Sequence, residues 1–522
     1  MVPKPVEPWP VREKKAYHRP LLAGSLMTLL LLACFVLGRQ SASSAACWLQ
    51  IDLAKLTAMN NGTAGTTNTL PNAATSSSAG FSRQACRSRY ESWRYYKYFP
   101  YAASPYLQRK LRAYEARHRR CAPGTPLYAK SVEQLRSGRS ADAGMECSYV
   151  VWLPFDGLGN RMLSMVSGFL YALLTDRVFL VALPPDSTDI FCEPFPADIE
   201  KSYTRLLDAK VIGPDANATA AGVPPYVYLS IGWQLKDPLF FCGEHQLVLG
   251  KVNWLLLYSD LYFSASRAVA DELRRLFPAK ESVSHLLSRY LLHPTNPVWS
   301  LATRYYRSYL APAKRRIGVQ IRMFRYGADD MFNQILACSR QENILPETDD
   351  ADDDDDAVVV AVATRSADNG GSNSTAILVA SLYADYYERL RSRYYVHAAK
   401  GGERVAVFQP SHEEQQATAN MAHNQRALAE IYLLSFSEEL LTSGTSTFGY
   451  VSSNLAGVRP TILLTAYGHK VPDPPCRRAV SMEPCNLTPP KGVQCQSKPL
   501  KEDVERHVRV CEDSKNGVKF FD

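Results

Sequence analysis

The sequence lacks the short motifs that mark a zinc site or a dinucleotide site. None of its 12 cysteines belongs to a C-x-x-C pair, and its glycine-rich stretches do not match G-x-G-x-x-G. Hydrophobic residues are not scarce, since they make up 46% of the 522 residues while charged residues make up 21%. This composition excludes a disordered protein and provides enough material for two core-forming domains.

One long apolar run, residues 21–38, lies near the amino terminus and follows a basic segment. Very few charges come directly after it. We therefore expect a single-pass membrane anchor, with residues 1–20 in the cytosol and nearly all of the mass in the lumen. A cleaved signal peptide, with small residues at 44–46 as its cleavage site, and a buried core helix are the alternatives.

Residues 39–85 are rich in Ser, Ala, Thr and Asn, which is typical of a flexible stem. In an oxidising lumen the cysteines that follow should form disulfides, and the last four of them predict a stapled C-terminal tail: Cys476, Cys485, Cys495 and Cys511. Sequons of the form N-x-S/T permit glycosylation at four positions: Asn61, Asn217, Asn373 and Asn486.

The net charge of +8 is concentrated in residues 83–120, where tyrosines are interleaved with the basic side chains. In a luminal protein this pattern favours a solvated or glycan-facing surface over a nucleic-acid site. The aspartate run at 352–356 lies among Ala, Ser, Asn and Gly. Consecutive side chains point in different directions, so we interpret the run as a solvated insertion rather than a metal site.

Apolar segments alternate with helical patterns along the chain and predict an α/β fold. In the first half, a strand at 149–155, a helix at 162–174 and a strand at 178–183 form a β-loop-α-β unit, which favours a parallel sheet. In the second half, helical stretches such as 382–391 and 420–436 separate five expected strands: 317–321, 376–381, 405–408, 440–442 and 461–464. This order predicts a second, doubly wound sheet.

Two segments are candidate phosphate-binding sites because they follow strands of these sheets. Arg322 lies at the carboxyl end of the strand at 317–321, where a guanidinium can grip a diphosphate through two parallel hydrogen bonds. Ser446 and Thr447 look like a helix cap, and the free N–H groups of such a helix start can bind a phosphate. A structural ion pair at Arg322 and ordinary helix capping are the competing interpretations.

Two further segments in the first half could face the same ligands. Gly157 and Gly159 mark a sharp turn between strand and helix, and Asn160 and Arg161 follow in the first helical turn. Asp260 lies in an apolar, aromatic segment, where its carboxylate could bind sugar hydroxyls and accept a proton. A tight structural turn and a buried structural aspartate are equally compatible with these patterns.

Several long stretches resemble the plant xyloglucan fucosyltransferase family (galactoside 2-alpha-L-fucosyltransferases). They include GLGNRMLSMVSGFLYALLTDRVFLV, IGVQIRMF, the stretch from QPSHEEQQ to TSTFGYV, and SMEPC, and the resemblance runs from about residue 86 to about residue 495. It implies a type II Golgi membrane enzyme of GT-B type, with two Rossmann-like lobes facing a cleft. The implied parts are an acceptor-side lobe at 86–312, a GDP-fucose-side lobe at 313–475 and a tail at 476–522.

The resemblance also implies roles for the candidate residues. Arg322 would bind the GDP diphosphate and help to expel it, with the donor phosphates flanked by Ser446, Thr447, Phe448 and the loop of Gly157, Gly159, Asn160 and Arg161. Asp260 would face the acceptor and is the first candidate base, Asp156 is the second, and a water relay is a third option. No cofactor or metal would be required.

The implied reaction is inverting transfer of L-fucose from GDP-fucose to a galactose, at its 2-hydroxyl, of xyloglucan or arabinogalactan. A homodimer or a complex with other Golgi glycosyltransferases are the expected assemblies, and no nucleic acid is expected as a partner. The alternative function is a catalytically weak or inactive relative that binds glycans or nucleotide sugars as a scaffold in a Golgi complex.

Overall fold

A computed structural model describes residues 82–139, 145–154, 156–183, 186–195, 206–207, 211–212, 225–231, 238–259, 270–323, 331–349, 374–466, 470–487, 496, 508–515 and 517–521. The predicted cytosolic tail, anchor and aspartate run lie outside these residues, as do residues 39–81 of the predicted stem and Asp260, Asn61, Asn217 and Asn373. Within the described ranges, no helix combines the length and apolar character that a membrane span requires.

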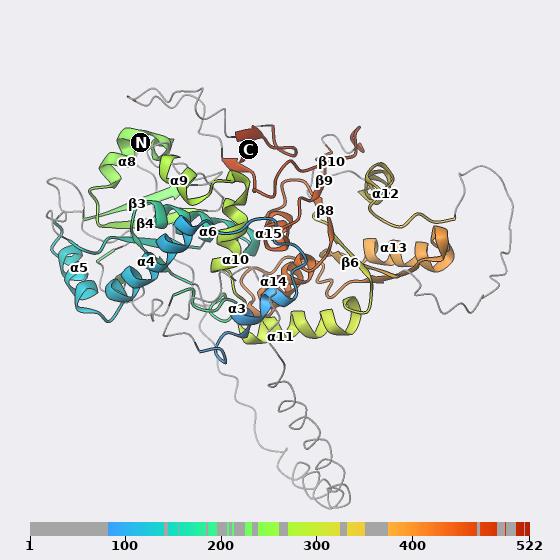
Figure 1. The fold of residues 1–522 in the computed structure, drawn as a ribbon, viewed down its shortest axis with the longest axis horizontal. Coiled ribbons are helices and arrows are strands. Elements are labelled where there is room, and N and C mark those ends of the chain that lie inside the picture. The colour runs from blue at the N-terminus through green and yellow to red at the C-terminus, as the bar shows by residue number, and fades with distance from the viewer. Residues whose placement is uncertain are drawn as a thin grey trace, which may run out of the picture. The chain divides into compact units, whose positions relative to one another are not determined.

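The first sheet has four parallel strands in the order β2-β1-β4-β3 (Figure 1). Its central strand β1 is buried at every position, as expected for a parallel strand covered on both faces. The predicted β-loop-α-β unit is confirmed, because β1 pairs with β2 through a helical connection. The strands are β1 (Tyr149–Leu153), β2 (Val178–Val181), β3 (Tyr226–Ile231) and β4 (Trp254–Ser259).

The second sheet has six strands in the order β10-β9-β8-β5-β6-β7. The five predicted strands form its parallel part, and each lies within two residues of its predicted bounds. The sixth strand, β10, pairs antiparallel with β9 and comes from the first residues of the predicted tail. The strands are β5 (Arg315–Gln320), β6 (Ser374–Ala380), β7 (Arg404–Phe408), β8 (Glu439–Ser443), β9 (Thr461–Leu463) and β10 (Cys476–Arg478).

A small antiparallel sheet of order β11-β13-β12 ends the chain. It consists of β11 (Asn486–Leu487), β12 (Val508–Val510) and β13 (Gly517–Phe520). Asn486, one of the predicted glycosylation sites, therefore lies on β11.

Helices surround the two larger sheets. In the amino-terminal half they are α3 (Arg87–Glu91), α4 (Pro105–Cys121), α5 (Pro126–Arg136), α6 (Leu158–Leu174), α8 (Gly243–Leu249), α9 (Ala270–Leu276), α10 (Val283–Leu291) and α11 (Asn296–Tyr305). In the carboxyl-terminal half they are α12 (Met331–Glu342), α13 (Asp385–Val396), α14 (Met421–Ser435) and α15 (Thr447–Ala456). Proline at the first turn of α4, α5 and α11 supplies the φ angle that a helix start needs.

One hydrophobic core lies between the two sheets and is shared by both. It contains buried residues of α6 and α10, which belong to the first half, together with residues of α14 and α15, which cover the second sheet. In Figure 1, α14 and α15 accordingly lie beside α6 and α10, and these helices are in contact. Two smaller clusters cover the outer faces, with α5 on the first sheet and α12 and α13 on the second.

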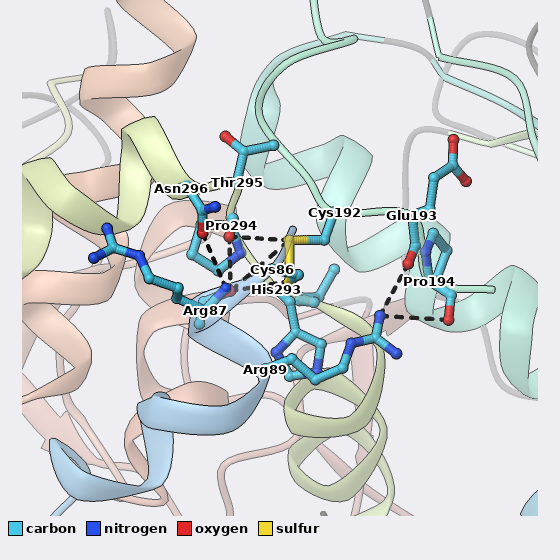
Figure 2. Close-up of a disulfide and its surroundings, with 12 residues drawn as sticks. Cys86, Arg87, Arg89, Cys192, Glu193, Pro194, His293, Pro294, Thr295 and Asn296 are labelled. Carbon is cyan, nitrogen blue, oxygen red and sulfur yellow. Dashed lines mark hydrogen bonds between the residues drawn. A yellow bond between two sulfur atoms is a disulfide. The ribbon is translucent and has the colours of Figure 1, made fainter. Parts of the chain in front are cut away.

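Disulfides join segments that are far apart in the sequence, as predicted for a luminal protein. Cys86 bonds Cys192 at the start of the described body, and next to it Arg89 donates to the carbonyl oxygen of Glu193 (Figure 2). In the tail, the predicted staple is confirmed for one pair, Cys485–Cys511. Two further bonds are Cys121–Cys147 and Cys338–Cys476, so Cys476 is tied to α12 instead of to the tail.

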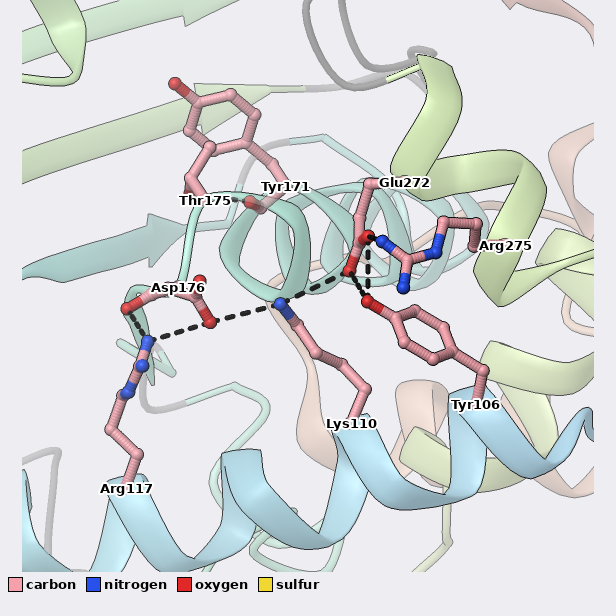
Figure 3. Close-up of polar contacts among 8 residues, drawn as sticks. All are labelled: Tyr106, Lys110, Arg117, Tyr171, Thr175, Asp176, Glu272 and Arg275. Atoms are coloured by element: carbon pink, nitrogen blue, oxygen red, sulfur yellow. Dashed lines mark hydrogen bonds and ion pairs between the residues drawn. The ribbon is translucent and has the colours of Figure 1, made fainter.

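Ion pairs occupy part of the basic segment at 83–120. Lys110 on α4 lies between Asp176 and Glu272, at 3.2 and 3.5 Å, and Arg117 contacts Asp176 at 2.9 Å (Figure 3). Tyr106 donates a hydrogen bond to the Glu272 carboxylate. These charges thus connect α4 with the end of α6 and with α9. The interpretation of the segment as a solvated or glycan-facing surface stays a prediction.

Candidate active site

The candidate residues gather at the carboxyl edges of the two parallel sheets, where open α/β sheets bind ligands. The turn that contains Gly157 follows β1, and Arg322 follows β5. Residues 409–418 follow β7, and residues 444–447 join β8 to α15. Contacts among these four segments define the site.

Arg322 is partly exposed and is held at both its backbone and its side chain. Its backbone N–H donates to Ser443 Oγ at the end of β8 over 2.9 Å. Its Nη2 donates to Gln416 Oε1, also over 2.9 Å. A guanidinium placed in this way at a sheet edge can bind a phosphate anion and stabilise a departing diphosphate.

Gln416 connects Arg322 to the turn of the first sheet. A Cβ atom added at Gly157 would lie only 2.8 Å from Gln416 Nε2, so the exposed side chain of Gln416 lies directly over this glycine. The structure therefore brings Arg322 and Gly157 to opposite sides of a single amide side chain. Two residues predicted from separate halves of the chain meet here.

Gly159 allows the starts of α6 and α15 to touch. A Cβ atom at this position would lie 2.6 Å from Thr447 Oγ1 and 3.0 Å from the backbone nitrogen of Phe448. No side chain larger than hydrogen fits without a shift of α15. The predicted contribution of Gly159, Thr447 and Phe448 to one site is therefore compatible with the geometry.

The start of α15 has the geometry of an anion site. Its N-cap residue is Ser446, as predicted, but the Ser446 side chain makes no capping hydrogen bond. The first intrahelical bond runs from the Tyr450 N–H to the Ser446 carbonyl, so the amides of the preceding turn have no intrahelical acceptor. Together with the helix dipole, they favour a negatively charged group at this end.

Asn160 and Arg161, in the first turn of α6, make side-chain contacts with residues of the amino-terminal half of the chain. Arg161 forms an ion pair with Asp186, with 2.6 Å between Nη1 and Oδ1, and contacts Ser187 Oγ at 2.7 Å. Asn160 donates to the Asp156 carboxylate over 2.8 Å. Asp156 is exposed and has a left-handed backbone with φ of 60°. Donor binding by Asn160 and Arg161 stays a prediction, as does the role of Asp156 as a base.

The loop that carries Gln416 is anchored to α14 by charged side chains. Glu413 contacts both His423 and Arg426. Burial alone would raise the pKa of Glu413, but hydrogen bonds from Arg426 and His423 hold this pKa below its ordinary value. These contacts keep the carboxylate charged and fix the loop next to Arg322.

A second carboxylate, on α14, is buried against the start of this loop. Glu430 on α14 accepts a hydrogen bond from Ser411. Burial, reinforced by the charge of Glu413, raises the pKa of Glu430 to about 8, although the Ser411 hydrogen bonds and Arg426 act in the opposite direction. Glu430 is therefore largely neutral at pH 7.

The sequence did not reveal Gln416 and Ser443 as site residues. Ser443 ends strand β8, so the rule that selected Arg322 also applies to it, whereas Gln416 lies inside the loop that follows β7. Their residue types gave no signal, because neutral amides and hydroxyls are common at such strand ends. Among the described residues, the one group with metal-ligand geometry is Cys485, Cys511 and Asp513, whose two cysteines form a disulfide.

Comparisons with known proteins agree with this arrangement. The family model for xyloglucan fucosyltransferase matches residues 50–496. A galactoside 2-alpha-L-fucosyltransferase of Pisum sativum is 41% identical over 474 residues, which cover 85% of this chain and 80% of that relative. A protein of the same name from Arabidopsis thaliana is 42% identical over 471 residues, which cover 85% of this chain and 81% of that relative.

Among solved structures, a mutant of Arabidopsis thaliana FUT1 in complex with GDP matches with a TM-score of 0.72 and 40% identity, covering 85% of this chain and 98% of that one. These matches define a glycosyltransferase. The chain belongs to the xyloglucan fucosyltransferase family, which confirms the resemblance, and it is a fucosyltransferase.

Proposed function

We propose that the protein transfers L-fucose from GDP-fucose to the 2-hydroxyl of a galactose residue in a plant cell-wall glycan, xyloglucan or arabinogalactan. The observation that carries this proposal is the meeting of Arg322, Gln416, Gly157 and the start of α15 at one edge. The names of the relatives, galactoside 2-alpha-L-fucosyltransferases, support the bond type. The GDP complex of a relative supports the donor.

In this proposal the chain binds the donor through its diphosphate. Arg322 approaches from β5, and the free amides of Thr447 and Phe448 approach from α15. Both place positive charge where negative charge grows as the bond between fucose C1 and the phosphate oxygen breaks. This arrangement supplies leaving-group stabilisation from the protein alone, so no metal ion or other cofactor is required.

The acceptor hydroxyl attacks C1 from the face opposite the diphosphate. A new bond forms between C1 and the galactose oxygen while the phosphate bond breaks, which inverts β-linked fucose to an α linkage. The hydroxyl proton passes to a base, either Asp260, Asp156 or a water molecule. The transition state resembles an oxocarbenium ion, so departure of the leaving group is the main electrostatic task.

We further infer a Golgi location and a type II topology, with residues 21–38 as the anchor and the catalytic body in the lumen. The described disulfides support an oxidising compartment. Within this proposal the first sheet belongs to an acceptor-side lobe, 86–312, and the second to a donor-side lobe, 313–475, with the cleft between them. Assembly as a homodimer or with other Golgi glycosyltransferases also remains a proposal.

A donor and acceptor panel tests the function. The detergent-solubilised full chain is incubated with labelled sugar nucleotides and with xyloglucan, arabinogalactan and free galactosides. We expect GDP-fucose to be the preferred donor, transfer to galactose, and activity that survives a chelator. GDP binding without transfer to any acceptor would favour a scaffold function, and a preference for another sugar nucleotide would contradict the donor.

A further inference from the structure

We propose that Asp513, in the C-terminal tail, is a positioning residue for the donor-phosphate loop, residues 443–447. This inference rests on the proposed function, since it assumes that the loop binds the GDP diphosphate. Asp513 lies outside residues 50–496, which the family model matches. It acts through Thr445 and is not assigned a contact with the donor.

Asp513 reaches the loop with one carboxylate oxygen. Its Oδ2 accepts a hydrogen bond from the Thr445 N–H over 2.7 Å and another from the Tyr450 hydroxyl over 2.5 Å. The aspartate is 5% exposed, so these bonds are shielded from water. One side chain of the tail thus holds both the loop and the first turn of α15.

The backbone of Thr445 explains why the loop needs such a support. Thr445 has a φ of 54°, a left-handed conformation that β-branched residues rarely adopt. The neighbouring Gly444 leaves little room, because a Cβ there would lie 2.8 Å from the Leu463 carbonyl oxygen and 3.3 Å from the Asp513 Cβ. The hydrogen bond to Asp513 holds Thr445 in this conformation directly before the amides of α15.

The tail in turn is fixed from several sides. The Cys485–Cys511 disulfide lies two residues before Asp513. The adjacent Glu512 accepts from the Val480 N–H over 2.7 Å and pairs with the buried Lys519 at 2.7 Å. Asp513 therefore lies between β12 and β13 in a segment that a disulfide and these two contacts hold in place.

Asp513 and Ser443 hold the two ends of the same loop. Ser443 Oγ accepts from the Arg322 backbone, which couples that end to the guanidinium, while Asp513 fixes the end that leads into α15. Loss of Asp513 should therefore misplace the phosphate-binding amides and leave the rest of the nucleotide site in place. The loss of Asp513 should therefore weaken the binding of ligands that carry the diphosphate and leave the binding of the nucleoside unchanged.

The test compares the Kd values of GDP and guanosine, measured by calorimetry on the full chain in detergent. For Asp513→Ala we expect the Kd of GDP to rise at least 10-fold while the Kd of guanosine changes less than 2-fold. Asp513→Asn should restore GDP binding to within about 3-fold, because its amide oxygen can accept both hydrogen bonds. Ser514→Ala, in the same turn but without contact to the loop, is the matched control and should bind GDP normally.

An unchanged Kd of GDP in Asp513→Ala, or an equal loss of GDP and guanosine binding, would overturn the proposal. If Asp513→Ala does not fold, Tyr450→Phe replaces it, because it removes one of the two donors to Asp513. It should raise the Kd of GDP 2- to 5-fold and leave guanosine unaffected, and no change would again overturn the proposal. Failure of wild-type protein to bind GDP would instead refute the proposed function.

Discussion

Arg322 illustrates how a single side chain can be assigned from sequence. It follows an apolar strand that was predicted to be parallel, and side chains at the carboxyl end of such a strand face the ligand edge. The structure places it there, within 2.9 Å of Gln416. A partly exposed guanidinium next to a neutral amide suits an anionic ligand.

We predict that Arg322→Lys lowers kcat/KM for fucosyl transfer by about 100-fold, the loss typical of removing one transition-state donor. A lysine retains the positive charge but cannot form two parallel hydrogen bonds to a diphosphate. Steady-state kinetics with GDP-fucose measure the effect. Arg340→Lys, at an exposed position on α12, is the matched control and should retain wild-type activity. Near-normal transfer by a folded Arg322→Lys protein would remove this residue from the site.

Other site residues were beyond the reach of sequence analysis for a physical reason. Gln416 and Asp513 act through contacts made by loops, and loop conformation depends on tertiary packing that no local pattern encodes. Asp513 lies 68 positions from its partner Thr445 along the chain. The ion pair of Arg161 with Asp186 was also beyond the reach of the sequence, and the predicted donor contact of Arg161 stays a prediction.

At the scale of elements, the site depends on how closely two helices approach each other. Helices α6 and α15 start at the edges of different sheets and touch at Gly159. The helix predicted at 162–174 from its periodicity is confirmed, and the structure shows that α6 is buried almost all round. The contact between its first turn and the start of α15 brings the two segments of the candidate site together.

We predict that Gly159→Ala impairs both stability and transfer. The added methyl group would collide with Thr447 and with the Phe448 backbone, so α15 must shift, at a cost of about 1–3 kcal/mol in unfolding free energy. Urea unfolding and GDP-fucose kinetics measure the two effects, and we expect kcat/KM to fall at least 10-fold.

Gly250→Ala is the matched control for this change. Gly250 follows α8 with helical φ and ψ, and a Cβ there would meet its nearest atoms at 3.4 Å. This substitution should leave activity unchanged. Equal behaviour of the two variants would show that the contact between α6 and α15 does not shape the site.

Strand prediction succeeded for most of the parallel strands, but burial alone did not decide it. The apolar run that forms β6 lies among other strand signals and was recognised, whereas the equally apolar run of β4 was not predicted as a strand. Strands β3 and β10 escaped prediction because β3 is only half buried and β10 reads Cys-Arg-Arg, with two exposed arginines. The place of β10 is set by tertiary contacts, among them the bond from Cys476 to Cys338.

At the scale of the whole molecule, the shared core buries histidines that must stay neutral. Burial lowers the pKa of His118 to about 4 and the pKa values of His285 and His293 to about 3. In the unfolded chain these groups take up protons below about pH 6.5. Because the unfolded state then binds more protons, the folded state loses stability as the pH falls from 6.5 toward these values.

We predict a lower unfolding free energy at pH 5 than at pH 7, with each histidine contributing about 1.4 kcal/mol per pH unit below 6.5. Glu430 acts in the opposite direction. The pKa of Glu430, about 8 in the folded protein, exceeds its ordinary value. The stabilisation that its protonated form gives the folded state is therefore fully present at low pH and is lost as the pH rises through 8. Urea unfolding at pH 7, 6 and 5 measures the combined effect of these groups on the unfolding free energy.

Glu430→Gln removes the opposing contribution and should make the loss of stability on acidification steeper than in the wild type. Identical pH profiles for the two proteins would contradict a raised Glu430 pKa. A wild-type stability that does not fall between pH 7 and pH 5 would contradict the assignment of neutral buried histidines.

The Cys86–Cys192 bond has a mechanical consequence. It joins the first residues of the described body directly to a segment 106 positions further along the chain. A force applied to the residues before Cys86 is therefore transmitted through this covalent bond to Cys192 as well as to α3. A force applied to the chain before Cys86 would have to break this bond before it could unfold the helices that lie between the two cysteines.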